Sequence, residues 1–148
     1  MIYHLQIGNN FTVYPYSSDR ADMNIGLGIC YDMRFPELRY VVFVFKWWLM
    51  LFMHSLIYNQ KNCKMIVFPS AFNMTTGPLH WDILAKGRAV DTQSYVILCS
   101  PARDEKGSYV AYGHSVIVSP WGKVVGQLDE KEGILMADID LKECDDVR

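Results

Sequence analysis

Cys30 is the residue of this chain best placed for covalent chemistry, because its neighbours predict a turn between a strand and a helix. Residues 25–29 alternate apolar side chains with glycines, which is typical of a buried strand that passes close to another backbone. Pro36 suits the first turn of a helix, and Glu37 suits its positive end. Such a turn favours thiolate over thiol, so Cys30 is a candidate nucleophile. The competing interpretation is an inert cysteine in the core, where free cysteines are common.

The segment around Cys30 resembles the nucleophile motif of the carbon-nitrogen hydrolases, the nitrilase superfamily. It reads GICYDMRFPE over residues 28–37. Three later segments resemble further blocks of the same family, in the same order: MIVFPSAFN (65–73), HWDILAKGRAVD (80–91) and GHSVIVSPWG (113–122). Four blocks in the family's order make this a specific resemblance.

Two loops resemble one branch of that family, the omega-amidases. They read NMTTGP over residues 73–78 and SPARD over residues 100–104. Omega-amidases hydrolyse the side-chain amide of short dicarboxylic acid monoamides such as alpha-ketoglutaramate. The resemblance implies an α/β fold, a partial α-β-β-α sandwich of the nitrilase type that lacks its N-terminal portion. It also implies one partial domain over residues 1–148, a homodimer or higher homo-oligomer, and no cofactor or metal.

The resemblance also assigns roles near the nucleophile. It makes Cys30 the nucleophile and the Tyr31 backbone N–H a donor to the oxyanion. Arg34 is expected to bind a substrate carboxylate, which a guanidinium can hold through two parallel hydrogen bonds. The competing role for Arg34 is a structural ion pair with Asp32 or Glu37.

Four further side chains are candidates for the site, and three of them also have a structural interpretation. Phe72 is expected to form a wall of the substrate pocket. Thr76 is a candidate donor to the substrate carboxylate, although a Thr-Thr-Gly-Pro stretch is also ordinary turn sequence. His80 and His114 are candidate bases in a Cys-His dyad, but the family uses neither, and single histidines are usually structural.

The family's catalytic set also contains a glutamate base and a lysine, both before the cysteine in chain order. Here no glutamate occurs before Glu37 and no lysine before Lys46. Glu37 belongs to the cysteine motif, and Lys46 lies in a segment that the family does not have, so neither is expected to substitute. The sequence therefore predicts an amidase by family, with a second hypothesis open: an inactive fragment that associates with intact homologues.

The segment without a family counterpart is residues 41–56, VVFVFKWWLMLFMHSL. A membrane span is one interpretation, but the apolar run falls short of the ~20 residues that a bilayer requires, and its lysine costs ~3 kcal/mol. A retained intron or gene-model error inside a helix is the favoured interpretation. Removing the segment restores a helix of ordinary length.

Composition fits a chain with an α/β core and excludes several classes. The 148 residues are 51% hydrophobic and 20% charged, with a net charge of -2 and no basic cluster, which argues against nucleic-acid binding. The four cysteines show no metal-ligand spacing, and the opening sequence does not resemble a signal peptide. We therefore expect a reducing compartment, the cytosol first and the mitochondrion as alternative, with a small-molecule amide as partner.

Periodicity predicts alternating strands and helices, as in an α/β layer architecture. A strand pair is predicted over residues 9–24, before the motif strand at 25–30 and a helix from about residue 35. A second helix is predicted over residues 80–93, with Trp81, Leu84, Ala85, Ala89 and Val90 on its apolar face. Further strands are predicted at residues 65–68, 95–99, 113–118, 123–128 and 134–139, with a hairpin turn at residues 121–122.

Overall fold

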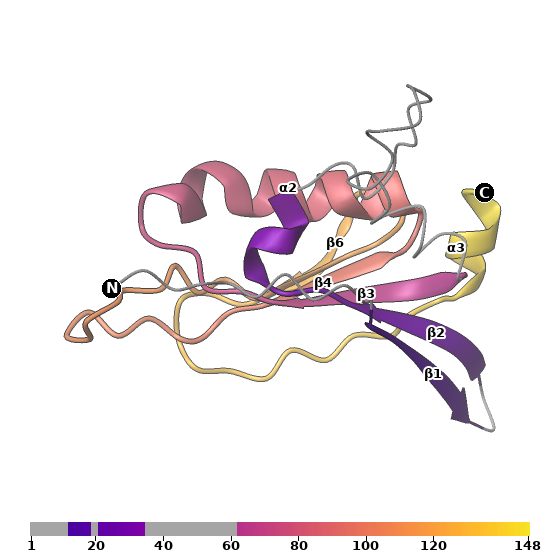
Figure 1. Ribbon diagram of the computed structural model, residues 1–148, viewed down its shortest axis with the longest axis horizontal. Helices are drawn as coiled ribbons and strands as arrows, with labels where there is room; N and C mark the ends of the chain where they lie inside the picture. The colour runs from indigo at the N-terminus through magenta and orange to yellow at the C-terminus, as the bar shows by residue number, and fades with distance from the viewer. Residues whose placement is uncertain (1–11, 19–20, 35–61) are drawn as a thin grey trace, which may run out of the picture.

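A six-stranded mixed sheet forms the centre of the computed structural model, which describes residues 12–18, 21–34 and 62–148 (Figure 1). The strands lie in the sheet in chain order. Their bounds are β1 Thr12–Ser18, β2 Ala21–Leu27, β3 Cys63–Pro69, β4 Tyr95–Cys99, β5 Val116–Val118 and β6 Val124–Gln127. The helices are the 3₁₀ helix η1 Cys30–Arg34, α2 Thr76–Thr92 and α3 Lys142–Asp146.

The pairing of the strands determines which loops meet. β2, β3 and β4 are parallel, so the loops that follow them leave the sheet at the same edge. β1 pairs with β2 as an antiparallel hairpin, and β5 and β6 extend the other side antiparallel. The predicted hairpin turn between β5 and β6 is confirmed, because the Ser119 N–H donates to the Lys123 carbonyl at 2.8 Å. The loops that follow β2, β3 and β4 therefore lie next to one another, at the C-terminal ends of these strands.

Each face of the sheet is covered differently. Helix α2 lies along one face, and Figure 1 shows the yellow segment after β6 passing along the other. The core under α2 contains Trp81, Ala85 and Ala89 of the helix against Ile66, Phe68, Val96, Leu98, Val116 and Val118 of the strands. A second, smaller core joins Tyr95, Ile117 and Cys144 with partly buried residues of the C-terminal segment. The sheet face under α2 therefore carries the larger of the two cores.

The motif strand ends earlier than predicted. The sequence predicted a strand over residues 25–30, preceded by a separate strand pair, but β2 runs Ala21–Leu27 and is itself the second strand of the hairpin. The reason is a local turn: the Ile29 N–H donates to the Asp32 carboxylate and the Asp32 N–H donates to the Ile29 carbonyl, both at 2.9 Å. These two bonds take the chain out of the sheet just before Cys30.

Helix α2 begins at Thr76, four residues before the predicted start at residue 80. Pro78 in its first turn is tolerated, since its missing N–H would have no partner within the helix. Trp81, Ala85 and Ala89 are buried as predicted, and Leu84 packs partly against the same core. Val90 was predicted on the apolar face but is 49% exposed, because the buried face turns through Arg88, Ala89 and Thr92 instead.

The predicted strand at residues 134–139 is wrong as secondary structure. Its alternation is correct: Leu135, Ala137 and Ile139 pack on the second core, while Ile134 and Met136 are 88% and 87% exposed. The structure assigns no strand there, because no strand of the described sheet pairs with this segment. Side-chain alternation predicts which residues face a surface, not whether a hydrogen-bonding neighbour is present.

Two predictions fall outside the described residues: the helix from about residue 35, and the apolar segment 41–56 with its possible membrane role. Within the described ranges, no helix combines the length and apolar character needed to span a bilayer.

Candidate active site

Cys30 lies where the chain leaves the edge of the parallel strands. It is the first residue of the 3₁₀ helix η1, three residues after the end of β2, and the helix predicted from about residue 35 lies outside the described residues. Its backbone φ of 40° lies in the left-handed region, which is uncommon for a residue with a side chain. The thiol is free and the residue half-buried. Strain of this kind is concentrated at functional sites, so the geometry supports Cys30 as the candidate reactive residue.

The residues between β2 and Cys30 pack closely against the next strand, β3. The Gly28 N–H donates to the Val67 carbonyl of β3 at 3.0 Å. A Cβ at Gly28 would lie 2.4 Å from the Phe68 ring, which no real side chain tolerates. The glycine therefore allows the β2 end and β3 to approach, as the sequence predicted for this stretch.

Arg34 closes the same 3₁₀ helix that Cys30 opens. Its guanidinium carbon lies 4.7 Å from the centroid of the Phe72 ring and 5.5 Å from that of Tyr31. Its Nη1 lies 3.1 Å from Nδ1 of His80 on α2. Asp32, one of the two ion-pair partners considered for Arg34, instead accepts the Ile29 N–H. The structure thus brings together two predicted substrate-binding residues, Arg34 and Phe72, with a histidine whose role here was not predicted.

Phe72 lies in the loop after β3 and contacts both helix α2 and the loop before β5. It is 4% exposed, and its ring packs edge-on against Trp81 of α2 at 5.1 Å. Its carbonyl accepts the Tyr112 N–H at 2.7 Å. A buried ring held on two sides is a rigid support for the guanidinium above it.

Thr76 lies at the start of α2 and interacts with Asn73. The Asn73 side-chain oxygen accepts the backbone N–H groups of Thr75 and Thr76 at 3.0 and 2.8 Å, and the Thr76 hydroxyl at 3.0 Å. This bonding satisfies donors that a helix leaves without partners in its first turn. Thr76 would have to release Asn73 to donate to a substrate, so the turn interpretation explains what is seen, and its substrate role stays a prediction.

Tyr109 contacts the loop that carries Phe72, and sequence reasoning missed this contact. Its hydroxyl donates to the Ala71 carbonyl at 2.8 Å, which ties the loop before β5 to the loop after β3. Partial burial raises the pKa of Tyr109, and the charge of Cys30 raises it further. No motif marks Tyr109, because only the fold brings these two loops together.

The two histidines considered as bases have other partners. His114 stacks on Tyr112 with a centroid distance of 4.1 Å, and its Nδ1 lies 2.8 Å from the Tyr112 carbonyl. Its own carbonyl accepts the indole N–H of Trp81 at 2.7 Å. His80 contacts Arg34. These contacts favour structural and positioning roles for both rings.

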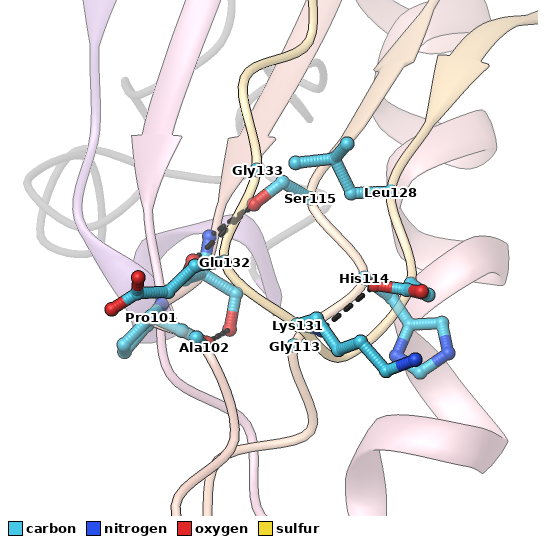
Figure 2. A pocket seen from close by; sticks show the side chains of 11 residues that line it. Pro101, Ala102, Gly113, His114, Ser115, Leu128, Lys131, Glu132 and Gly133 are labelled. Carbon is cyan, nitrogen blue, oxygen red and sulfur yellow. Dashed lines mark hydrogen bonds between the residues drawn. The ribbon is translucent and has the colours of Figure 1, made fainter.

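A polar hollow of about 240 Å³ lies between the loops that surround β4, β5 and β6. Figure 2 shows His114, Ser115, Lys131 and Glu132 around it. The Ser100 N–H donates to the Ser115 hydroxyl at 2.9 Å. Of the candidate residues, His114 lines this hollow, whereas Cys30, Tyr31, Arg34, Phe72, Thr76 and His80 do not. We therefore place the candidate site at Cys30, Arg34 and Phe72.

The mixed sheet, with a free cysteine at the turn after the parallel strand β2, is the arrangement that the resemblance to the nitrilase superfamily implies. Residues 4–148 match the model of the carbon-nitrogen hydrolase family, and the chain belongs to that family. The resemblance based on four sequence blocks is thereby confirmed.

The most informative relatives are omega-amidases. The chain is 46% identical over 144 residues to omega-amidase NIT2 of Bos taurus and 45% identical to that of Homo sapiens. In both cases the match covers 97% of this chain and 45% of the relative. The chain therefore spans about half the length of the curated relatives it matches.

Solved structures give the same fold. The Nit3 protein of Saccharomyces cerevisiae, a member of branch 10 of the nitrilase superfamily, is 41% identical with a TM-score of 0.79. That match covers 96% of this chain and 45% of the yeast chain. The NitFhit protein of C. elegans is 35% identical with a TM-score of 0.64, covering 84% of this chain and 26% of that one. The predicted fold class, a partial nitrilase-type α/β structure, is confirmed.

Proposed function

We propose that this chain carries the nucleophile and the acid-recognising residue of an omega-amidase-type hydrolase. The substrate class is short dicarboxylate monoamides resembling alpha-ketoglutaramate, converted to the dicarboxylic acid and ammonia. The observation that carries the proposal is a single short helix with Cys30 at one end and Arg34 at the other, the guanidinium being held over Phe72.

The chemistry at Cys30 is a two-step acyl transfer. The thiolate attacks the amide carbonyl, and the tetrahedral intermediate collapses to a thioester with loss of ammonia. Water then attacks the thioester, which releases the carboxylic acid and returns the thiol. The proton transfers require a general base, which the family resemblance supplies as a glutamate. The oxyanion is stabilised by a lysine and by the Tyr31 N–H in the same scheme.

Selectivity for an acidic amide is assigned to Arg34. A guanidinium on an aromatic face keeps its in-plane N–H groups directed outward, where a carboxylate accepts two of them. The buried Phe72 ring excludes water from one side of that pair, which strengthens the attraction. A neutral amide of the same length gains nothing from this contact.

The second candidate function is association without catalysis. Ile134 and Met136 are almost fully exposed in an extended segment, and apolar side chains so exposed favour contact with another protein surface. An inactive polypeptide that associates with an intact homologue would account for this exposure.

One comparison separates the two functions. A chimaera joins the N-terminal half of the bovine relative to this chain with residues 41–56 removed, and ammonia release from alpha-ketoglutaramate is measured. The amidase proposal predicts turnover by the chimaera and none by the 148-residue polypeptide alone. An inactive but folded chimaera, with the 148-residue polypeptide co-eluting with the intact bovine protein, would instead support the association function.

A further inference from the structure

The contact between Arg34 and His80 specifies the protonation of the imidazole. Nη1 of Arg34 lies 3.1 Å from Nδ1 of His80. A guanidinium has five N–H donors and no acceptor, and it stays charged in proteins. The Arg34 N–H therefore donates, and Nδ1 of His80 must be the bare acceptor nitrogen. The ring is then neutral, with its proton on Nε2.

The backbone that carries His80 is held in place by the contacts of helix α2. His80 is the fifth residue of α2, whose start is fixed by the Asn73 side chain. The next residue, Trp81, is buried, and its indole N–H donates to the His114 carbonyl. The imidazole therefore extends from a well-packed helix, whereas Arg34 lies at the last residue of a five-residue 3₁₀ helix.

Three contacts restrict the orientation of the guanidinium. The centroids of the Phe72 and Tyr31 rings lie 4.7 and 5.5 Å from its carbon, and one of its N–H groups donates to Nδ1 of His80 at 3.1 Å. A carboxylate needs two parallel N–H groups, and the guanidinium has five. An arginine without such an acceptor would lose more side-chain entropy when it binds an anion.

We propose that His80 is a positioning residue that orients the Arg34 guanidinium to receive the substrate carboxylate, through its neutral Nε2-protonated form. This inference rests on the proposed function for the carboxylate, but the pairing of the two side chains does not. His80 is not assigned a proton-transfer role. It acts on the substrate only through Arg34.

The test uses the full 148-residue chain and the reactivity of Cys30. The probes are 5-chloro-4-oxopentanoate, whose carboxylate lies two methylene groups from its carbonyl, and its neutral methyl ester. The thiolate forms the S–C bond and chloride leaves, and peptide mass spectrometry gives the rate at each cysteine. The readout is the ratio of the anionic to the neutral rate at Cys30, with exposed Cys99 as internal reference.

His80→Leu is expected to lower this ratio roughly tenfold at Cys30 and leave it unchanged at Cys99, as expected from losing a hydrogen bond to a charged group. His80→Asn, whose side-chain oxygen can occupy the Nδ1 position, should restore most of the ratio. His114→Asn is the matched control, since its ring contacts Tyr112, and it should retain the full ratio. A ratio that survives His80→Leu within twofold, or an Asn variant no better than Leu, would overturn the positioning role.

A second measurement separates this inference from the proposed function. If Arg34→Gln leaves the ratio unchanged, or if neither reagent modifies Cys30, the carboxylate site of the proposed function is wrong. Nitrogen-15 NMR then decides the pairing: His80 should show a bare Nδ1 and a protonated Nε2, and Arg34→Gln should move the Nδ1 resonance of His80 but not that of His114. A protonated Nδ1 at His80, or one insensitive to Arg34, would contradict the inference.

Discussion

The guanidinium carbon of Arg34 lies 4.7 Å from the centroid of the Phe72 ring, within the range of a cation–π contact. The two residues are far apart in the chain and come from different elements, the end of η1 and the loop after β3. Phe72 is buried against Trp81, so the ring cannot move without disturbing the core. This relationship places a positive charge on a rigid apolar wall near the candidate nucleophile.

Arg34→Ala should therefore impair an acidic amide selectively. In the chimaera described above, we expect a loss of about 2–5 kcal/mol of transition-state binding for alpha-ketoglutaramate, as for truncating one partner of a buried charge pair. A neutral amide of similar length should lose far less. The measurement is kcat/KM for both substrates, and equal losses on the two would assign Arg34 a structural role.

The four cysteines should differ in reactivity in the folded chain. Burial raises the pKa of Cys63 to about 11, with the Arg148 charge opposing it, and burial also raises the pKa of Cys144. Both residues are 0% exposed. At pH 8 we expect iodoacetamide to modify Cys30 and, more slowly, Cys99, while Cys63 and Cys144 react only after unfolding.

Peptide mass spectrometry of timed samples checks this order. Cys99 is exposed as a residue, but burial of its sulfur raises its pKa, so its rate should climb steeply as the pH increases. Modification of Cys63 as fast as Cys30 under native conditions would show that the core beneath α2 is not closed.

Two glycines of α2 offer a matched test of how the helix is positioned. A Cβ at Gly77 would lie 2.3 Å from the Tyr112 ring, whereas a Cβ at Gly87 would meet nothing within 4 Å. Gly77→Ala should destabilise the chain by about 1–3 kcal/mol through overpacking. Gly87→Ala should stabilise it by about 0.5–1 kcal/mol, because alanine loses less backbone entropy in a helix.

Chemical denaturation of both variants measures these differences. Gly77 lies in the first turn of α2, three residues before His80, so a shift of this turn should also move His80. Gly77→Ala should therefore lower the anionic-to-neutral labelling ratio at Cys30, and Gly87→Ala should not. A neutral effect of Gly77→Ala on stability would mean that Tyr112 moves aside freely.

The pair of Lys64 and Asp145 links β3 to the C-terminal helix. Lys64 is 8% exposed and bonds to the Asp145 carboxylate, which lowers the pKa of Asp145 below its ordinary value of 3.8. A carboxylate with a lowered folded pKa stabilises the fold above its unfolded pKa, and this contribution is lost as the pH falls through the folded value. Asp145→Asn should therefore lower the melting temperature at pH 7 and flatten the loss of stability below pH 3.8.

Asp146→Asn is the control for that variant, because it removes the same charge from the adjacent, exposed residue. Thermal unfolding at pH 7 and pH 3 compares the two. If both variants melt alike at pH 7, the buried Lys64 ammonium does not depend on Asp145.

Much of this fold could be predicted from local sequence. The apolar run at β4 matched its predicted bounds, residues 95–99, and the burial of Trp81, Ala85 and Ala89 followed from helical spacing. The end of β2 could not be predicted, because it depends on a side-chain bond from Asp32 back to the Ile29 backbone. Residues 134–139 alternate correctly but form no strand, since pairing requires a neighbour that periodicity does not reveal.

The candidate site likewise contains residues that could be predicted from the sequence and residues that could not. Cys30, Arg34 and Phe72 could be found because they stand within or next to recognisable motifs. His80 and Tyr109 were missed in their present roles, because their contacts with Arg34 and Ala71 span 46 and 38 residues of sequence. Tertiary contacts of this length have no signature in a single sequence.

The most direct test of the account is ammonia release from alpha-ketoglutaramate by the chimaera and by variants of it in which one cysteine is replaced. We predict that Cys30→Ala abolishes release while Cys99→Ala retains most of it, because only Cys30 occupies the strained turn beside Arg34. Mass spectrometry during turnover should also find the acyl group on Cys30. Substantial turnover by a folded Cys30→Ala protein, or an acyl group on another cysteine, would contradict the assignment of Cys30 as the nucleophile.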